Sequence, residues 1–240
     1  MTQTRVETAR VGKPRLLDLF CGAGGCTKGY QRAGFYVVGV DSNPQPNYCG
    51  DEFIQGDALE ILRWGAVSVL YEAVHASPPC QAFSLASLWH GKSNQDRHPD
   101  LVAPTRELLE AAGLPYVMEN VVGAPLRADL TLCGEMFGLG VHRHRIFELD
   151  GFFAMRLPHP PHRLRSAKHN CHVEEGYTRI VAGNYADHES ASEAMGVDWM
   201  SRKELAQAIP PAYTEHIGGY LMTAVQQPDA PRPKETTTHD

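Results

Sequence analysis

The decisive stretch is Leu16-Leu17-Asp18-Leu19-Phe20-Cys21-Gly22-Ala23-Gly24-Gly25, an apolar strand that runs directly into a glycine turn. A helical pattern follows from about Cys26 to Ala33. A strand, a glycine turn and a helix in this order place backbone N–H groups and a helix N-terminus against an anionic group. The dinucleotide pattern G-x-G-x-x-G fails, because its sixth position counted from Gly22 is Thr27. The stretch predicts the first strand–helix unit of an α/β sheet without a nicotinamide fingerprint.

Two further strand-like runs each end in an acidic residue. Tyr36-Val37-Val38-Gly39-Val40 ends in Asp41, and Phe53-Ile54-Gln55-Gly56 ends in Asp57. The alternation continues with helices at Ala58–Leu62 and Thr105–Ala112 and strands at Tyr116–Met118 and Ile146–Leu149. Strands that alternate with helices predict an α/β fold with a doubly wound, mostly parallel sheet.

A thiol and a carboxyl group stand where two more apolar runs end. Ala73-Val74-His75-Ala76 leads into Ser77-Pro78-Pro79-Cys80-Gln81, and Glu119 follows the strand at Tyr116–Met118. Two consecutive prolines form a stiff corner that holds Cys80 at the carboxyl end of a strand, the edge where α/β sheets bind ligands. A lone cysteine is more often a buried structural residue, so the interpretation of Cys80 depends on its companion motifs.

In combination, the motifs resemble those of the DNA cytosine-C5 methyltransferase family. The short interval from about Asp150 to Ser190 is similar to that of its compact phage-borne members. The cofactor loop of that family is matched by Asp18-Leu19-Phe20-x-Gly22-x-Gly24-Gly25, and the nucleophile motif by Pro79-Cys80-Gln81. Glu119-Asn120-Val121 matches the glutamate motif, and Arg143-His144-Arg145-Ile146 the later part of the arginine motif. Gln207-Ala208-Ile209-Pro210-Pro211 resembles the segment that completes the cofactor pocket. The motifs keep the order of the family over about residues 15–220.

The resemblance implies transfer of a methyl group from S-adenosylmethionine to C5 of a cytosine flipped out of double-stranded DNA. Cys80 would add to C6 of the base, and Glu119 would hydrogen-bond the N3/N4 edge. Arg145 and Arg143 would hold the O2 side of the cytosine. The side chain that removes the C5 proton is not evident, which favours water or hydroxide as the base.

The same resemblance implies the contacts to the cofactor. Phe20 would stack on the adenine, Asp41 would accept from the ribose hydroxyls, and Asp57 would accept from the adenine amine. The other implied cofactor-binding residues are Asp18, Gly22, Gly24, Gly25, Ala58, Pro79, Gln207 and Ala208.

Two positions depart from the family pattern. Val141 replaces the glutamine that opens the arginine motif, and Ala206-Gln207 replaces the usual Gly-Asn pair. These changes affect how the far edge of the base and the methionine end of the cofactor are held. They keep a second interpretation open, a catalytically silent DNA-binding protein of the same fold. A third is an RNA cytosine methyltransferase, although Pro79-Cys80-Gln81 matches the DNA-acting pattern.

The net charge of −6 conceals a basic segment. Residues 142–179 hold seven Lys/Arg and four Asp/Glu, a net charge of +3, which leaves −9 (15 basic, 24 acidic) for the rest. A local basic face can bind phosphates on an acidic protein, and the alternative is a solvated loop. The expected DNA-binding residues are Gln81, Ser84, Arg163, Arg165, Lys168 and Arg179, and the expected lid is the segment from Phe83 to Pro99.

Two short patterns in that segment also suggest zinc. They are His159-Pro160-Pro161-His162 and His169-Asn170-Cys171-His172. Structural zinc uses such pairs of ligands. Because cysteine is scarce and histidine is common in DNA-facing loops, we expect no metal site here.

Composition and length agree with one catalytic domain and a small lobe. The chain has 240 residues, 42% hydrophobic and 21% charged, with six irregularly spaced cysteines and no apolar run long enough for a membrane span. We expect a cytoplasmic monomer without a membrane partner. The expected division is a catalytic and cofactor-binding domain at 15–149, a short target-recognition region at 150–190, a returning C-terminal segment at 191–225, and disordered tails at 1–14 and 226–240.

Overall fold

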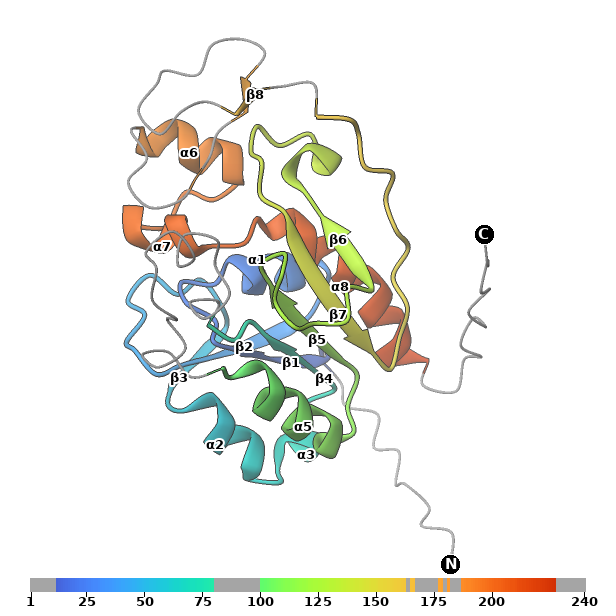
Figure 1. Ribbon diagram of the computed structural model, residues 1–240. Helices are drawn as coiled ribbons and strands as arrows, with labels where there is room; N and C mark the ends of the chain where they lie inside the picture. The colour runs from blue at the N-terminus through green and yellow to red at the C-terminus, as the bar shows by residue number, and fades with distance from the viewer. Residues whose placement is uncertain are drawn as a thin grey trace, which may run out of the picture.

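The computed structural model describes residues 12–79, 100–162, 165–166, 177–178, 181 and 187–227. At its centre lies a seven-stranded sheet with the order β3-β2-β1-β4-β5-β7-β6 (Figure 1). The strands are β1 Arg15–Leu19, β2 Tyr36–Asp41, β3 Glu52–Gln55, β4 Ala73–Ala76, β5 Tyr116–Asn120, β6 Leu130–Leu132 and β7 Arg145–Asp150. The helices are α1 Gly25–Arg32, α2 Ala58–Arg63, α3 Val67–Leu70, α5 Val102–Ala112, η3 Gly134–Phe137, α6 His188–Met195, α7 Arg202–Gln207 and α8 Pro211–Gln226. A separate two-stranded sheet pairs β8 Arg165–Ser166 with β9 Tyr177–Thr178.

The predicted doubly wound, mostly parallel sheet is confirmed. The strands β1 to β5 pair in parallel, whereas β7 runs antiparallel to both β5 and β6. This arrangement brings the carboxyl ends of β1, β2, β4 and β5 to one edge of the sheet, where α/β folds bind their ligands.

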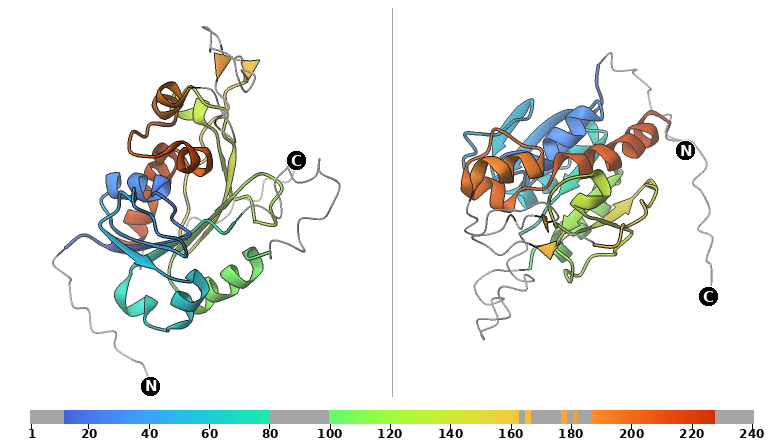
Figure 2. Two further views of the ribbon diagram at one scale, coloured as in Figure 1. Left: turned by 90° about the vertical axis from the view of Figure 1, so that its left-hand side faces the viewer. Right: turned by 90° about the horizontal axis from the view of Figure 1, so that it is seen from above.

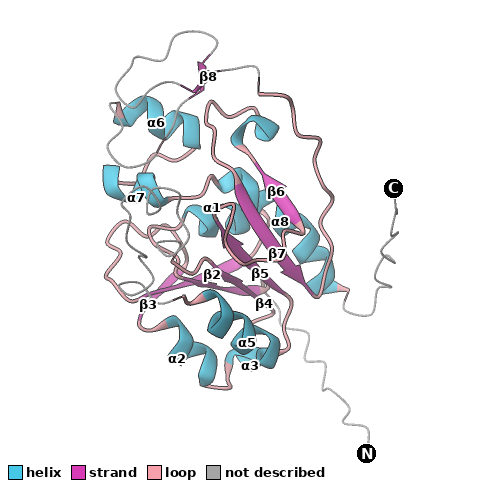
Figure 3. Ribbon diagram, viewed as in Figure 1, coloured by secondary structure: helices cyan, strands magenta, loops and turns pink. Residues whose placement is uncertain are grey.

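Helices cover both faces of the sheet. Because successive strand residues point to opposite sides, neighbouring residues of a strand belong to different cores. Leu16 and Val37 belong to a core that includes residues of α1 and α8. Leu17 and Val38, one position further on, belong to a second core with residues of α2, α3 and α5. Figure 3 shows α2, α3 and α5 below the sheet and α1 and α8 on its other side. Burial on both faces explains why these strands are apolar without alternation.

The last helix packs closely against the first. The Thr214 hydroxyl in α8 donates to the carbonyl of Cys26 in α1 at 2.8 Å. A Cβ at Gly29 would lie 2.1 Å from that hydroxyl oxygen, so this approach requires glycine. The C-terminal segment thus completes the core around the first strand–helix unit, and α8 continues to Gln226.

A smaller core lies beyond the sheet, around Val141, Val181, Met195 and Leu205. The left view of Figure 2 shows α6 and α7 (orange) at the opposite end of the molecule from α2 and α5 (cyan and green). Val141, where the arginine motif departs from the family pattern, is fully buried here. Within the described ranges, no helix combines the length and the apolar character needed to cross a membrane.

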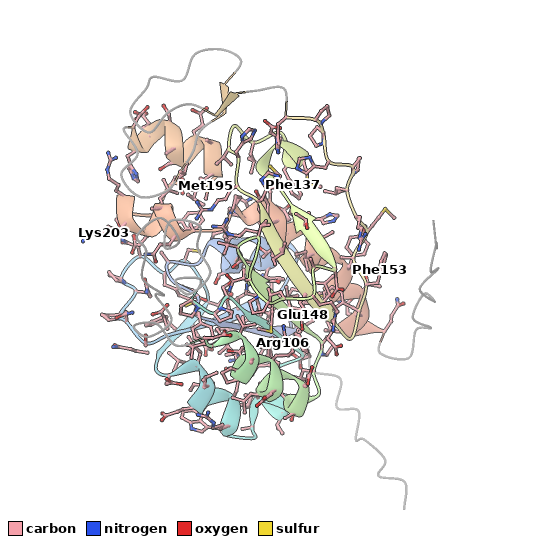
Figure 4. The ribbon with its side chains drawn as sticks, viewed as in Figure 1. Arg106, Phe137, Glu148, Phe153, Met195 and Lys203 are labelled. Atoms are coloured by element: carbon pink, nitrogen blue, oxygen red, sulfur yellow. The ribbon has the colours of Figure 1, made fainter. Side chains whose placement is uncertain are left out.

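A buried ion pair fastens β7 to α5. Glu148 accepts two hydrogen bonds of 2.8 Å from Nε and Nη2 of Arg106, and Figure 4 labels both side chains. It also accepts from the backbone N–H of Arg127 at 2.9 Å and from the hydroxyl of Tyr116 at 3.3 Å. Burial alone would raise the pKa of Glu148, but the hydrogen bonds and positive charges of Arg106 and Arg127 together outweigh it and the pKa is lowered. The carboxylate is thus held in its charged form between three elements.

Candidate active site

The carboxyl edge of the sheet encloses a pocket of about 490 Å³. This volume lies within the range of small-molecule sites. Its wall combines the glycine turn, the loop after β2, Ser77-Pro78-Pro79, the end of β5 and the segment Met200–Ile209. The predicted site residues that line it are Asp18, Phe20, Gly22, Gly25, Asp41, Pro79, Glu119, Arg143, Arg145, Gln207 and Ala208. The sequence motifs therefore meet in one place.

The glycine turn is held in its shape by Asp41. Gly22 and Gly24 have positive φ values of 50° and 89°. Phe20, with φ of 59°, is the one non-glycine residue of the described chain with a positive φ. Such strain in a non-glycine residue is typical of ligand-binding turns. The carboxylate of Asp41 accepts from the N–H of Gly22 at 3.1 Å and from that of Asn43 at 2.9 Å. These bonds connect the ends of β1 and β2 at the pocket wall.

Asp18 is a buried carboxyl group with one oxygen unsatisfied. Its Oδ2 accepts from the Thr27 hydroxyl at 2.5 Å, while Oδ1 has no hydrogen-bond partner among the described residues. Burial raises the pKa of Asp18 to about 7. An orphaned buried oxygen in a pocket wall indicates that a ligand donor or cation completes the site.

Replacing Asp18 with Asn should stabilise the free protein at alkaline pH. The pKa of Asp18 rises from 3.8 to about 7 on folding, so the folded state holds an extra proton between these values and stability falls as pH rises through that window. Asn carries no charge, and its amide oxygen still accepts from Thr27. The stability difference between variant and wild type should grow by about 2 to 3 kcal/mol from pH 5 to pH 8 in denaturant unfolding. A difference that does not change with pH would contradict this account.

Glu119 and Arg145 form a pair in the same pocket. Nε of Arg145 lies 3.0 Å from Oε1 of Glu119. Oε1 of Glu119 accepts no hydrogen bond from the described residues, so its contact with Arg145 is an ion pair without hydrogen-bond geometry. Burial raises the pKa of Glu119 more than Arg145 lowers it. The carboxyl group is therefore biased toward its protonated form, as a proton donor requires.

A buried polar chain that the sequence analysis did not identify leads to Glu119. The Tyr30 hydroxyl lies 2.9 Å from Nδ1 of His75, and Nε2 of His75 lies 2.9 Å from the hydroxyl of Ser77. Burial lowers the pKa of His75 to about 3, so the ring is neutral. Ser77 also hydrogen-bonds Glu119. The one sign of this chain in the sequence is His75, a histidine within the otherwise apolar strand β4.

Three predicted site residues have contacts of a different kind. Arg143 donates to the backbone carbonyls of Val181 at 2.5 Å and Ala206 at 2.9 Å, and so joins separate parts of the chain at the pocket wall. Asp57 caps α2 by accepting from two backbone N–H groups through Oδ1, and Ala58 is buried beside it. Asp57, Ala58 and Gly24 are not among the residues that line the pocket. The role of Asp57 toward the adenine stays a prediction.

The remaining predicted residues lie outside the part of the chain that the structure describes. They are Cys80, Gln81, Ser84, Arg163, Lys168, Arg179 and the segment 83–99, together with the side chain of Arg165. The structure in turn adds lining residues that no motif marked, namely Ser42, Asn43, Gln45, Met200, Lys203 and Glu204. Lys203 extends from α7 at the rim of the molecule in Figure 4.

The architecture is that of the S-adenosylmethionine-dependent methyltransferase fold. Its solved neighbours include a protein described as a DNA modification methyltransferase encoded within an E. coli prophage (TM-score 0.62, 13% identity, 89% of this chain and 99% of that one). Others are a DNMT2 variant from Spodoptera frugiperda (TM-score 0.56, 12% identity, 88% and 99%) and the S. pombe Dnmt2 methyltransferase (TM-score 0.54, 14% identity, 90% and 99%). At these identities the likeness shows the fold.

Sequence relatives have matching names. The chain is 24% identical over 184 residues to the Type II methyltransferase M.AgeI of Thalassovita gelatinovora, a match that covers 62% of this chain and 42% of that protein. It is 34% identical over 122 residues to the Type II methyltransferase M.AquIA of Picosynechococcus, which covers 45% and 49%. The chain thus spans about half the length of these relatives. No model of a protein family matches it.

Proposed function

We propose that the chain is an S-adenosylmethionine-dependent methyltransferase that modifies C5 of cytosine in double-stranded DNA. The observation that carries the proposal is the buried Glu119 beside Arg145, in a pocket that Pro79, the residue before Cys80, also lines. The names of the sequence relatives support methyl transfer, and the name of the solved neighbour from a prophage supports DNA as the substrate. The order of the motifs supports cytosine-C5 as the position modified.

The pocket residues fit the cofactor that the fold implies. S-adenosylmethionine is cationic at its sulfonium and ammonium groups and carries ribose hydroxyls and an adenine ring. The orphaned oxygen of Asp18 suits a cation or donor, Asp41 suits the ribose hydroxyls and Phe20 suits the adenine. Gln207 and Ala208 would close the opposite wall. When bound there, the cofactor supplies an electrophilic methyl group.

The residues of the chain would activate the base by adding to it. The Cys80 thiolate forms a bond to C6, and the C5=C6 π electrons move to form C4=C5. The C4=N3 π electrons move onto N3, which takes the proton of Glu119. Arg145 holds the O2 side of the ring and favours the thiolate. C5 of this enamine is nucleophilic, whereas C5 of free cytosine is not.

The later steps restore the aromatic ring. Once C5 carries the methyl group, its hydrogen leaves as a proton to water or hydroxide. The electrons of that C–H bond re-form C5=C6, and the C6–S pair departs with Cys80. N3 returns its proton to Glu119, so the side chains end in their starting states. Because both faces of the ring are engaged, the base must leave the duplex, and residues 83–99 are the proposed lid.

The test is expression in a host without cytosine methylation, followed by bisulfite sequencing of its DNA. We expect 5-methylcytosine within a short site of about two to four base pairs, because the proposed recognition region at 150–190 offers few side chains and each bidentate contact discriminates by about 1 to 3 kcal/mol. Arg163, Arg165, Lys168 and Arg179 are the proposed readers, and arginine favours an adjacent guanine. Unmodified DNA would contradict the proposed activity, and modification confined to a six-base palindrome would contradict the short site.

Variants of the acids should separate binding from chemistry. Asp41→Ala removes the acceptor proposed for the ribose and should weaken cofactor binding by about 1 to 3 kcal/mol in calorimetry. Glu119→Gln should mainly lower the rate of methyl transfer in single turnovers, with cofactor affinity nearly unchanged. Equal losses of cofactor affinity in both variants would contradict the assigned roles.

Asp57→Asn provides a sharper test of the third acid. Asparagine is as good a helix cap as aspartate, so α2 keeps its cap. The variant replaces the second carboxylate oxygen, which is not engaged in the cap, by an amide NH₂ group. The proposed contact with the adenine amine predicts weaker cofactor binding at unchanged thermal stability. Unchanged affinity would limit Asp57 to its role in the helix cap.

A further inference from the structure

A cysteine and three histidines converge outside the pocket. Cys133 follows β6, His144 precedes β7, and His159 and His162 lie on the chain that follows β7. One potential ligand atom from each lies within 4.8 Å of all the others. Nε2 of His144 lies 3.0 Å from Nε2 of His159 and 3.1 Å from Nε2 of His162. In a tetrahedral zinc site, Zn–N bonds of about 2.0 to 2.1 Å place two nitrogens about 3.3 Å apart.

The three Nε2 atoms of these rings have too few N–H groups to hydrogen-bond one another at these distances. Nδ1 of His159 lies 2.8 Å from the carbonyl of Pro160, and Nδ1 of His162 lies 2.6 Å from Oε2 of Glu135. A neutral imidazole has a single N–H, so both rings donate through Nδ1 and direct a lone pair from Nε2 toward His144. Nε2 of His144 carries at most one proton, so it cannot donate a full hydrogen bond to both the His159 and the His162 lone pair. A cation at the centre resolves this conflict.

We propose that Cys133, His144, His159 and His162 bind one Zn²⁺ ion. A thiolate with three imidazoles suits zinc, and four protein ligands leave no open position, which is typical of a structural site. Cys133 is a free thiol and is fully buried. The site revises the expectation of no metal: the sequence alternative grouped His159 and His162 with residues 169–172, which lie outside the described residues, and did not include Cys133 or His144.

Glu135 supplies the outer support that zinc histidines usually have. Its second carboxylate oxygen lies 2.7 Å from Nε2 of His142. A carboxylate on the remote nitrogen of a ligating histidine fixes the orientation of the ring. Glu135, His142 and His162 also form a possible three-ligand group. The four-residue group is favoured because it contains the thiolate and leaves Glu135 in this supporting position.

The ion would link three segments on which the proposed active site depends. It joins the end of β6, the residue between Arg143 and Arg145, and the first part of the proposed recognition region at 150–190. Its role is therefore to position these arginines. The proposal rests on the geometry of the ligands alone and holds whatever reaction the pocket catalyses.

Metal analysis of the purified full chain tests the site. After dialysis against a weak chelator, mass spectrometry should find about one zinc per chain. Cys133→Ser and His159→Ala should lower the zinc content at least about tenfold, whereas His142→Ala, Cys171→Ser and His216→Ala should retain it. Glu135→Gln should weaken zinc affinity about 10- to 100-fold. Wild-type protein without zinc, or loss of zinc in His142→Ala or Cys171→Ser but not in Cys133→Ser, would overturn the proposal.

Cobalt substitution keeps the test independent of variant folding. Wild-type protein reconstituted with Co²⁺ should show the intense visible absorption of tetrahedral coordination and a near-ultraviolet thiolate-to-cobalt band. The thiolate band should persist in Cys171→Ser. A weak octahedral spectrum, or the absence of the thiolate band in the wild type, would refute a site that contains Cys133.

Discussion

Cys80→Ala should abolish methyl transfer, with a loss of at least about 10⁴-fold, because the base is not activated without addition at C6. Cofactor affinity should stay close to that of the wild type, since the thiol acts on the base and not on the sulfonium. Transfer of a labelled methyl group to DNA measures the first effect, and calorimetry with the cofactor measures the second. Substantial residual activity would remove the basis of the proposed mechanism.

A covalent trap supplies the positive counterpart of this experiment. DNA that carries 5-fluorocytosine at the target cannot lose a C5 proton, so the wild type should form an adduct that survives denaturing electrophoresis. Cys80→Ala should form none. Cys49→Ser is the matched control, because it removes a different thiol, partly exposed and remote in sequence, and should still form the adduct. Adduct formation by Cys80→Ala would assign the nucleophile to another residue.

Arg106→Ala should produce the largest loss of stability among single variants of the described charged residues. It leaves Glu148, whose side chain is 1% exposed, buried without its counter-charge. Breaking a buried pair in this way costs about 3 to 5 kcal/mol, which urea unfolding measures directly. Because the pKa of Glu148 is lowered on folding, the stability from this pair is present above the usual carboxylate range and is lost as pH falls through the folded-state pKa.

Two controls isolate the charge. Adding Glu148→Gln to Arg106→Ala should recover part of the loss, because no uncompensated charge then remains buried. Arg32→Ala disrupts an exposed pair, whose side chains are 45% and 48% exposed, and should cost less than about 1 kcal/mol. A similar cost for Arg32→Ala and Arg106→Ala would show that burial does not determine the effect.

The sequence predicts the first half of the fold well, because local and global signals agree there. The strands β1, β2 and β4 are mostly apolar and buried on both sides. Strand β2 ends at an acid, and β1 and β4 are followed within three residues by a glycine and a proline. The predicted helix at residues 105–112 begins earlier, at Val102, with Leu101 as its N-cap. Asp100 accepts from the N–H of Val102 at 2.8 Å. The strand β6 has three residues and is defined by its pairing with β7, which no local pattern encodes.

The candidate site divides in a similar way. Residues in contiguous motifs, such as Asp18 and Glu119, are predicted together because each lies near the carboxyl end of a strand, at the same edge of the sheet. Lys203 and Met200 line the pocket through the return of the C-terminal segment, a tertiary event without a local signature. The partners of His159 are likewise distant in the chain, and only the fold shows that Cys133 is close.

The close contact between α1 and α8 determines when the protein can finish folding. Thr214 meets Cys26 across 188 residues of sequence, so this part of the core cannot form until α8 has left the ribosome. Until then the face with Tyr30 and Val37 has no cover, although the face packed by α2 and α5 can already assemble. Nascent chains that stall before α8 should therefore expose apolar surface and be prone to aggregation. Deleting α8 should yield aggregates rather than a smaller folded protein.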